Sequence, residues 1–452
     1  MFRRLLIANR GEVAARVLRT CKRLGIETVA VASRADREAS WLEGVDIVVP
    51  LGPARAAESY LDADALIEVG LRHRCAAVHP GWGFLSENAV FARRCEAAGL
   101  TFVGPDPHHM GLMGDKAVAR DTMAALGMPV IPGSDGEVDS LEEARELADR
   151  IGYPVLLKAV AGGGGRGMRG VDSADQLADA YRDATAEALA SFGDGRLYLE
   201  KRIVDGRHVE VQILADGFGT CLHLGERECS VQRRHQKVVE EAPSPGLSPE
   251  ERARVLPLVA DVVRRSGYRN AGTVEMLLDA DGSLYFMEMN TRLQVEHPVT
   301  EQVTGLDLVE LQLRVAANQR LPLSQADIGV SGHALELRIN AEDPAQGFRP
   351  GPGTVDKLHF PQGEGVRVDT HLAQGDRIPP DYDSMIAKLI LSGPDRATVL
   401  ERARQAVAAT VIEGVPTNLD LHGAILRWQP FVSGNYHTKS LEQDLHLLVG
   451  GA

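Results

Sequence analysis

The sequence predicts a mixed α/β and α+β protein of about three domains: a doubly wound parallel sheet first, an α+β middle and a mostly β end. Its 452 residues exceed the usual size of one domain. Residues 3–8, a helical pattern over 11–24 and the run "ETVAVAS" make a strand–helix–strand unit typical of a parallel sheet. After residue 331 short strand-like runs such as "ALELRI" and "TVDKLHF" dominate, with one helix expected near 395–410.

Composition excludes several classes of protein. The net charge of −14 argues against a nucleic-acid partner, because phosphate contacts need a basic face. The five cysteines are scattered and lack C-x-x-C spacing, which predicts neither a disulfide framework nor a zinc site. The apolar run in the opening "MFRRLLIANRGE" is too short for a signal peptide, and no later apolar run is long enough to span a membrane. We therefore expect a cytoplasmic protein with no membrane or nucleic-acid contact.

Helix signals divide the first half of the chain. The loop "HPGWGFLSEN" contains Ser86, which is expected to cap a helix ending at Gly99. The segment "GDKAVARDTMAALGMPVIPG" predicts a further helix, and a capping box of Ser140 and Glu143 predicts another that stops near Gly152. Later, "SPEERARVLPLVADVVRRSG" has Ser248 as its cap and a glycine as its terminator.

Four consecutive glycines stand out in "KAVAGGGGRGM", residues 158–168. A formal G-x-G-x-x-G fingerprint would need a helix directly after it, but an extended piece follows and the first plausible helix begins near Ser173. The pattern predicts a hairpin tip whose backbone N–H groups can close over phosphates, aided by Lys158 and Arg166. From the stretch alone, a plain flexible surface turn is an equal alternative.

The stretch 271–298, "AGTVEMLLDADGSLYFMEMNTRLQVEHP", carries the strongest chemical signal. Its Asp-Gly pair predicts a hairpin, and a two-residue turn would place Glu275 opposite Glu288. Two facing carboxylates are unfavourable unless a cation lies between them, and Mg²⁺ fits. A solvated outer glutamate is the alternative, and a three-residue turn would shift the register by one. If the chain stays extended, alternation places five polar residues on one side, namely Glu288, Asn290, Arg292, Gln294 and Glu296.

Two further polar features suggest anion contacts. Lys116 lies at the start of a predicted helix, where a cation opposes the helix dipole, so a contact with an anion is expected. The block "QRRHQK" holds Gln232, His235 and Lys237 in an extended run. Taken alone, this block is best interpreted as a solvated basic edge strand.

The chain resembles the biotin carboxylase family of ATP-grasp enzymes over nearly its whole length. The matching stretches are "IANRGEVAARVLR", "HPGWGFLSEN", "MGDK", "GYPVLLKA", "GGGGRGM", "RHVEVQ", "QRRHQKVVEEAPSP", "EMNTRLQVEHPVTE", "RINAEDP" and "YDSMIAKL". The resemblance implies an N-terminal domain over 1–113, an ATP-grasp domain over 114–330 with a mobile glycine-rich lid at about 131–203, and a C-terminal domain over 331–446.

The resemblance also implies roles for individual residues, which are grouped here by ligand. The nucleotide is expected to contact Lys116, Lys158, Gly164, Gly165, Glu200, Lys201, Ile203, His208, Gln232, His235, Glu275 and Glu288. The expected metal ligands are Glu275, Glu288 and Asn290, and the expected bicarbonate pocket is Lys237, Arg292 and Val295. Glu296 is expected to act as general base, and Arg338 to bind biotin and steady its enolate.

The implied reaction uses ATP with Mg²⁺ (or Mn²⁺) and bicarbonate to carboxylate biotin through carboxyphosphate. Because no Met-Lys-Met biotinylation motif is present, the biotin carboxyl carrier protein and the carboxyltransferase are expected on other chains. A homodimer is expected, and acetyl-CoA carboxylase is the expected setting, although another acyl-CoA or pyruvate carboxylase stays open.

Two departures from the family pattern and two other readings accompany the resemblance. The lid has four glycines in a row where five are usual, and Trp82 replaces a usual tyrosine, which leaves every catalytic group in place. A different ATP-grasp ligase that joins a carboxylate to an amine would share Glu275 and Glu288, but would not need Lys237, Arg292, Glu296 and Arg338 together. A non-catalytic nucleotide-binding subunit is the other alternative.

Overall fold

The computed structural model describes residues 1–160 and 168–449, which form two compact units. Unit 1 comprises Met1–Met128, Arg207–Met276 and the chain from Glu288 onward, and unit 2 comprises Pro129–Gly206 with Leu277–Met287. Within the described residues no helix has the length and apolar character needed to cross a membrane.

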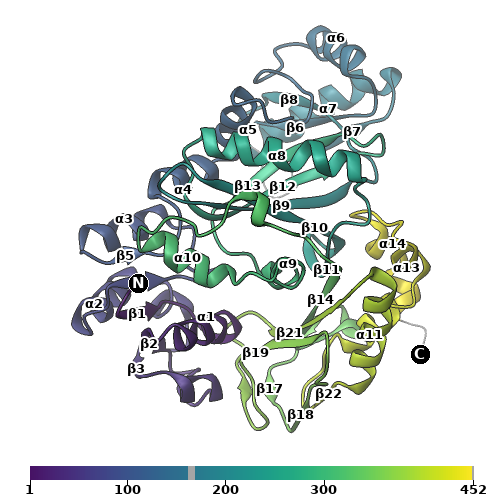
Figure 1. The fold of residues 1–452 in the computed structure, drawn as a ribbon. Helices are drawn as coiled ribbons and strands as arrows, with labels where there is room; N and C mark the ends of the chain where they lie inside the picture. The colour runs from purple at the N-terminus through teal and green to yellow at the C-terminus, as the bar shows by residue number, and fades with distance from the viewer. Residues whose placement is uncertain (161–167, 450–452) are drawn as a thin grey trace. The chain divides into compact units, whose positions relative to one another are not determined.

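Unit 1 begins with a parallel sheet of five strands in the order β3-β2-β1-β4-β5 (Figure 1). Alternate residues of β1 enter two separate cores: Leu5 and Ile7 pack with Val17 of α1, whereas Leu6 packs with Phe91 of α3. Both faces of the sheet are therefore covered, which confirms the doubly wound prediction. The elements are β1 Arg4–Ile7, α1 Gly11–Arg23, β2 Glu27–Ala32, β3 Ile47–Pro50, α2 Ala63–Arg72, β4 Ala77–His79, α3 Ala89–Ala97, β5 Thr101–Phe102, α4 Pro107–Gly114 and α5 Lys116–Ala125.

The cap of α3 differs from the prediction. The side chain of Asn88, not of Ser86, accepts the Phe91 N–H at 2.9 Å. The prediction of Ser86 was wrong because its own N–H closes a turn onto the Gly83 carbonyl, two residues before the actual cap, Asn88.

A second sheet of eight strands follows the order β13-β12-β9-β10-β11-β14-β21-β19 (Figure 1). The sheet continues across residue 330, where the resemblance implies a boundary between domains. Strand β11 pairs with β14, with Glu240 opposite Glu336. Its strands and the helices on it are β9 Arg207–Ala215, β10 Cys221–Arg233, β11 Gln236–Ala242, α8 Pro249–Arg265, β12 Asn270–Leu278, β13 Leu284–Asn290, α9 His297–Thr304, α10 Leu308–Ala316, β14 His333–Asn340, β19 Val366–Thr370 and β21 Met385–Gly393. The predicted cap of α8 at Ser248 is confirmed, and Glu251 completes a capping box that was not predicted.

The basic block "QRRHQK" does not form an edge strand. It is the tight turn between β10 and β11, where Arg234 and His235 have positive φ, and both strands have neighbours on either side in the sheet. Gln232 lies directly opposite Lys237 and is only 6% exposed. The edge-strand interpretation was wrong because the order of strands depends on distant partners that no local pattern reveals.

The last part of the chain holds the short strands and also more helices than expected. The expected helix is α11 Arg396–Ala409, and three short helices are added: α12 Leu419–Ile425, α13 Gln429–Ser433 and α14 Ser440–Val449. Leu421, Phe431 and Leu441 of these helices pack into the same core as β14 and β21. The remaining strands are β15 Glu342–Asp343, β16 Arg349–Pro350, β17 Gly353–Thr354, β18 Lys357–His359, β20 Arg377–Ile378 and β22 Val411–Glu413.

Unit 2 contains a three-stranded antiparallel sheet, β7-β6-β8, covered by α6 and α7. Lys158 pairs with Met168 across β6 and β7, so two strands flank the glycine run as predicted, and the tip at 161–167 with Gly164, Gly165 and Arg166 lies outside the described residues. Ser140 caps α6, but the Glu143 carboxylate accepts from Asp139 N–H and not from the cap residue, so only half of the predicted box forms. The elements are α6 Leu141–Ile151, β6 Val155–Ala159, β7 Met168–Val171, α7 Ala174–Phe192 and β8 Leu197–Lys201.

Candidate active site

Most predicted site residues of unit 1 lie on adjacent strands of the eight-stranded sheet. His208 comes from β9, Lys237 from β11, Glu275 from β12, Asn290 from β13 and Arg338 from β14. Because successive residues of a strand alternate between faces, each strand can present one or two side chains to a common site. The sheet order therefore gathers residues that are far apart in the sequence.

Lys237 lies at the centre of this group. Its ammonium is 2.6 Å from Glu210 Oε2, 2.5 Å from Glu296 Oε1 and 3.2 Å from Glu275 Oε1. Burial by itself would lower the pKa of Lys237, but the surrounding negative groups raise it well above its usual value. Lys237 is therefore a fixed cation that allows three carboxylates to share one small volume.

Glu296 is completely buried at the turn before α9. It accepts from Lys237 and, at 2.9 Å, from Arg338 Nη2. Burial alone would raise the pKa of Glu296, but Lys237 and Arg338 hold it well below its usual range. The carboxylate is thus ionised at neutral pH and can accept a proton.

Two acidic residues of the site were missed from sequence. Glu210 accepts from Lys237 and, at 2.5 Å, from Nε of the fully buried Arg227 directly opposite on β10. Glu87 accepts from the Thr291 N–H at 3.0 Å and from Arg292 Nε at 2.7 Å. Both lie inside quoted motifs, "RHVEVQ" and "HPGWGFLSEN", and the alternation of polar residues in the first was an available signal for Glu210.

The hairpin that carries the predicted metal ligands has a three-residue loop. Asp279 N–H donates to Ser283 O at 2.8 Å and Gly282 N–H to Asp279 O at 3.1 Å, so the predicted two-residue turn was wrong by one residue. The pairing of Glu275 with Glu288 no longer follows from the turn. Instead, Asn290 Nδ2 donates to Glu275 Oε1 at 2.8 Å.

The predicted polar row is gathered by a bend and not by an extended strand. The strand β13 ends at Asn290, and Val295 and Glu296 form a turn into α9. Arg292 nevertheless donates to Gln294 Oε1 at 2.7 Å and to Asn290 Oδ1 at 3.0 Å, and Gln294 Nε2 donates to Glu275 Oε1 at 3.1 Å. These amide and guanidinium bonds connect the row to Glu275.

The donor set fits a hard divalent cation. Each carboxylate is held by an ammonium: Glu275 by Lys237, and Glu288 Oε2 by Lys116 at 2.7 Å. Carboxylate and amide oxygens of Glu275, Glu288 and Asn290 are the ligand types that Mg²⁺ prefers.

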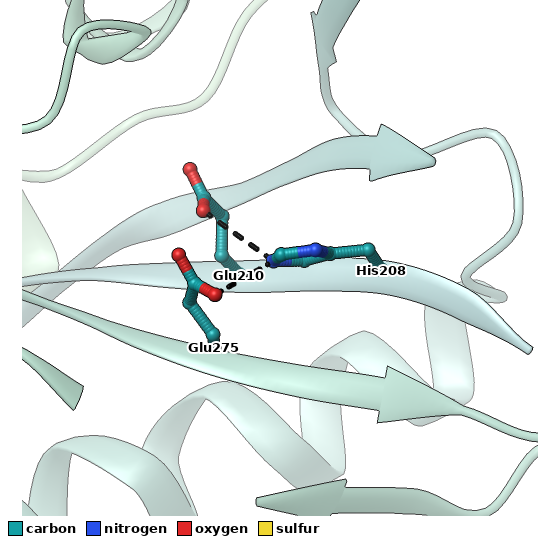
Figure 2. A group of neighbouring side chains, drawn as sticks. All are labelled: His208, Glu210 and Glu275. Atoms are coloured by element: carbon teal, nitrogen blue, oxygen red, sulfur yellow. Dashed lines mark ion pairs between the residues drawn. The ribbon is translucent and has the colours of Figure 1, made fainter. Parts of the chain in front are cut away.

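His208 adds a nitrogen beside the same carboxylates. Figure 2 shows its ring pointing at Glu275 and Glu210, with Nε2 3.2 Å from Glu275 Oε2 and 3.8 Å from Glu210 Oε2. Burial by itself would raise the pKa of Glu275, but Lys237 and His208 hold it below its usual value. Glu275 is thus a buried anion that contacts both Lys237 and His208.

Unit 2 positions the other predicted nucleotide residues. Lys158 Nζ lies 2.5 Å from Glu200 Oε2, across neighbouring strands β6 and β8. Lys201 donates to the carbonyls of Gly152 and Tyr153 at 3.0 and 3.1 Å, and Ile203 follows directly after β8. The ammonium of Lys201 is thus engaged by the chain itself.

Comparison with known proteins identifies the family. Residues 1–110 match the family model "Biotin carboxylase, N-terminal domain", residues 115–324 match "Carbamoyl-phosphate synthase L chain, ATP binding domain", and residues 336–443 match "Biotin carboxylase C-terminal domain". A biotin carboxylase of Nostoc sp. is 48% identical and one of Pseudomonas aeruginosa 49%, each over 98% of this chain and 99% of the relative. The chain belongs to the biotin carboxylase family.

Solved structures of biotin carboxylases have the same fold. The biotin carboxylase domain of a thermophilic 2-oxoglutarate carboxylase bound to ADP has a TM-score of 0.94 at 46% identity, covering 99% of both chains. The biotin carboxylase subunit of a pyruvate carboxylase has a TM-score of 0.92 at 46% identity, also over 99% of both chains. The protein is an ATP-grasp ligase, which confirms the fold and the class of enzyme predicted from sequence.

Proposed function

We propose that this enzyme uses ATP, Mg²⁺ and bicarbonate to carboxylate biotin on a separate carrier protein. The observation that carries the proposal is the buried cluster of Lys237, Glu296 and Arg338, in which two cations hold one ionised carboxylate. A carboxylate–amine ligase needs an ATP site but has no use for this arrangement. A non-catalytic subunit would have no need of this cluster, because apolar residues of similar volume are often as stable as a buried ion pair.

The residues of the cluster divide the chemistry between them. Lys237 and Arg292 hold the bicarbonate anion, and its oxygen attacks the γ-phosphorus of ATP to give carboxyphosphate and ADP, while Glu296 takes the bicarbonate proton. Glu275, Glu288 and Asn290 would hold Mg²⁺, which would neutralise phosphate charge when bound. Carboxyphosphate then splits into CO₂ and phosphate, the phosphate takes the N1 proton of biotin, and N1 attacks the CO₂ carbon while Arg338 steadies the enolate oxygen.

The remaining site predictions are part of this proposal. They include the nucleotide contacts of Lys116, His208, Gln232 and His235 in unit 1 and of Lys158, Glu200, Lys201 and Ile203 in unit 2, the bicarbonate contact of Val295, and a lid over about 131–203. Mn²⁺ can replace Mg²⁺ because both accept oxygen ligands. A Hydrogenobacter thermophilus relative was solved as a dimer with MgADP and bicarbonate, which supports these ligands and a homodimer. The five free cysteines support a reducing, cytoplasmic location.

The decisive experiment measures ADP release with and without bicarbonate and biotin. We expect ATP hydrolysis to require bicarbonate, and labelled bicarbonate to enter free biotin slowly and a separate biotinylated carrier faster, because the carrier brings its own binding contacts. Hydrolysis that is indifferent to bicarbonate would contradict the proposal. Activity only with another carboxylate and an amine would favour the other type of ATP-grasp ligase.

For the final acceptor we propose acetyl-CoA, which would make this reaction the first step of an acetyl-CoA carboxylase in fatty acid synthesis. A second candidate is a 2-oxo acid, because a 2-oxoglutarate carboxylase small subunit of H. thermophilus is 46% identical over 99% of this chain and 94% of that relative. Mass spectrometry of co-purified carboxyltransferase, with transfer assays on acetyl-CoA, pyruvate and 2-oxoglutarate, distinguishes them.

A further inference from the structure

Lys388 is a fully buried lysine with no part in the proposed reaction. It lies on β21, within the motif "YDSMIAKL". Its ammonium donates to the carbonyl oxygen of Val295 at 2.9 Å and pairs with Glu12 Oε1 of α1 at 2.9 Å. Glu12 belongs to the motif "IANRGEVAARVLR" and is 4% exposed. Two motifs near opposite ends of the chain thus meet beneath the bicarbonate pocket.

The register of the sheet places Lys388 beside Arg338. The two residues are directly opposite on β21 and β14, and such residues project from the same face. Arg338 Nη2 contacts the side chain of Glu296 at 2.9 Å, while Lys388 Nζ contacts the carbonyl of the preceding residue, Val295. Neighbouring cations therefore hold two successive residues of one turn.

The Val295–Glu296 turn lies in a segment that no helix or strand stabilises. Residues 291–296 belong to no helix or strand, and they separate β13 from α9. Glu87 fixes the start of this segment through the Thr291 N–H, and Lys388 fixes its end through Val295 O. The position of the proposed base Glu296 thus depends on anchors from distant parts of the chain.

Stability alone does not account for a lysine here. Removing an ammonium and a carboxylate from water costs free energy that their attraction only partly returns, and an apolar pair of similar volume is often as stable. The side chains of Lys388 and Glu12 are 0% and 2% exposed, so water does not stabilise either charge. What a lysine adds at this position is the hydrogen bond to Val295 O, which an apolar side chain cannot make.

We propose that Lys388 is a positioning residue for bicarbonate, which holds the Val295–Glu296 turn so that the anion and the proposed base meet in the correct geometry. Glu12 serves to neutralise it. This inference rests on the proposed function, since it assumes that bicarbonate binds at Lys237, Arg292 and Val295.

The test is Lys388→Met, which keeps an unbranched side chain one atom shorter and removes the donor. We expect KM for bicarbonate to rise about tenfold or more, with KM for ATP changed by less than about twofold, because the turn loses its anchor while the nucleotide residues keep theirs. The matched control is Arg396→Met on α11, which breaks a partly buried ion pair, with Glu241 at 2.7 Å. It should lower Tm and leave the KM for bicarbonate unchanged.

A double variant guards against simple misfolding. Lys388→Met leaves Glu12 buried without a partner, so Lys388→Met with Glu12→Gln should recover Tm while KM for bicarbonate stays raised. A double variant with the KM for bicarbonate of the wild type would overturn the positioning role. Wild-type protein without bicarbonate-dependent ATP hydrolysis would instead overturn the proposed function, so the two failures are distinguishable.

Discussion

Three buried carboxylates around Lys237 are tolerated because each also has a second cation or amide partner. Glu210 has Arg227, Glu296 has Arg338, and Glu275 has the amides of Asn290 and Gln294. In such a network each carboxylate depends on its partners, and removing one partner leaves a buried charge uncompensated. Single substitutions here therefore report on function only when they keep the shape of the side chain.

Glu296→Gln keeps that shape but cannot take a proton. We expect bicarbonate-dependent ATP hydrolysis to fall by about two orders of magnitude, since general base catalysis contributes about 10²–10⁴-fold. KM for ATP should stay within about twofold, because the amide oxygen still accepts from one of the two cations and the proposed nucleotide residues are unchanged. Steady-state kinetics with varied bicarbonate and ATP measure both quantities, and normal turnover would place the base elsewhere.

Glu288→Gln tests the predicted metal site. A neutral amide is a weaker ligand than a carboxylate, so the Mg²⁺ concentration for half-maximal activity should rise by about tenfold. A suitable control is Glu310→Gln on α10, where the carboxylate pairs with Arg314. Titration of activity with Mg²⁺ decides the matter, and an unchanged requirement in Glu288→Gln would remove this residue from the site.

Individual helices differ in how their first turns are satisfied. In unit 2 both long helices follow a serine, but only Ser140 caps through its side chain, which accepts the Glu143 N–H of α6 at 3.2 Å. Ser173 precedes α7 without such a bond. A serine at the N-cap is therefore expected to stabilise α6 more than α7.

Ser140→Ala should lower the stability of α6 by about 1 kcal/mol, because the N-terminal N–H loses its acceptor. Ser173→Ala is the matched control and should lower that of α7 by only a few tenths of a kcal/mol. Native-state hydrogen exchange of amides in the two helices gives both free energies. Equal losses would mean that the bond of Ser140 contributes nothing.

Across the molecule, several histidines are buried in their neutral form. Burial, reinforced for the first two by nearby arginines, lowers the pKa of His79 and His371 to about 3 and that of His422 to about 4, against an ordinary value of 6.5. The unfolded chain binds these protons below pH 6.5 and the folded chain does not. Stability is therefore full above that pH and falls as the pH drops toward the folded pKa values.

Between the unfolded and the folded pKa, each such histidine lowers the free energy of unfolding by about 1.4 kcal/mol for each unit that the pH falls. His422→Gln removes one of them and keeps a donor for the Arg338 carbonyl, which His422 Nε2 approaches at 2.7 Å. We expect the free energy of unfolding in urea to fall less between about pH 6.5 and 5 in this variant, by about 1.4 kcal/mol per pH unit. Identical slopes in variant and wild type would show that His422 is not buried neutral.

The sequence by itself determined the features that depend on local order. The strand–helix–strand unit at the start of the chain, the cap at Ser248 and the strands on both sides of the glycine run follow from periodicity and turn chemistry within a few residues. The roles assigned to Lys237, Glu296 and Arg338 came from the motifs that contain them. The Asp-Gly hairpin was found, but its register missed by one because the bond between Asp279 and Ser283 sets the loop length.

Only the tertiary structure decided which residues meet. The block around His235 became an interior turn because β10 and β11 pair with β9 and β14, and no local pattern specifies such distant partners. Glu210, hidden among strand residues, reaches Lys237 because neighbouring strands in the sheet come from separate parts of the chain. Lys388 and Glu12 meet for the same reason, since burial in a common core, and not spacing along the chain, pairs their charges.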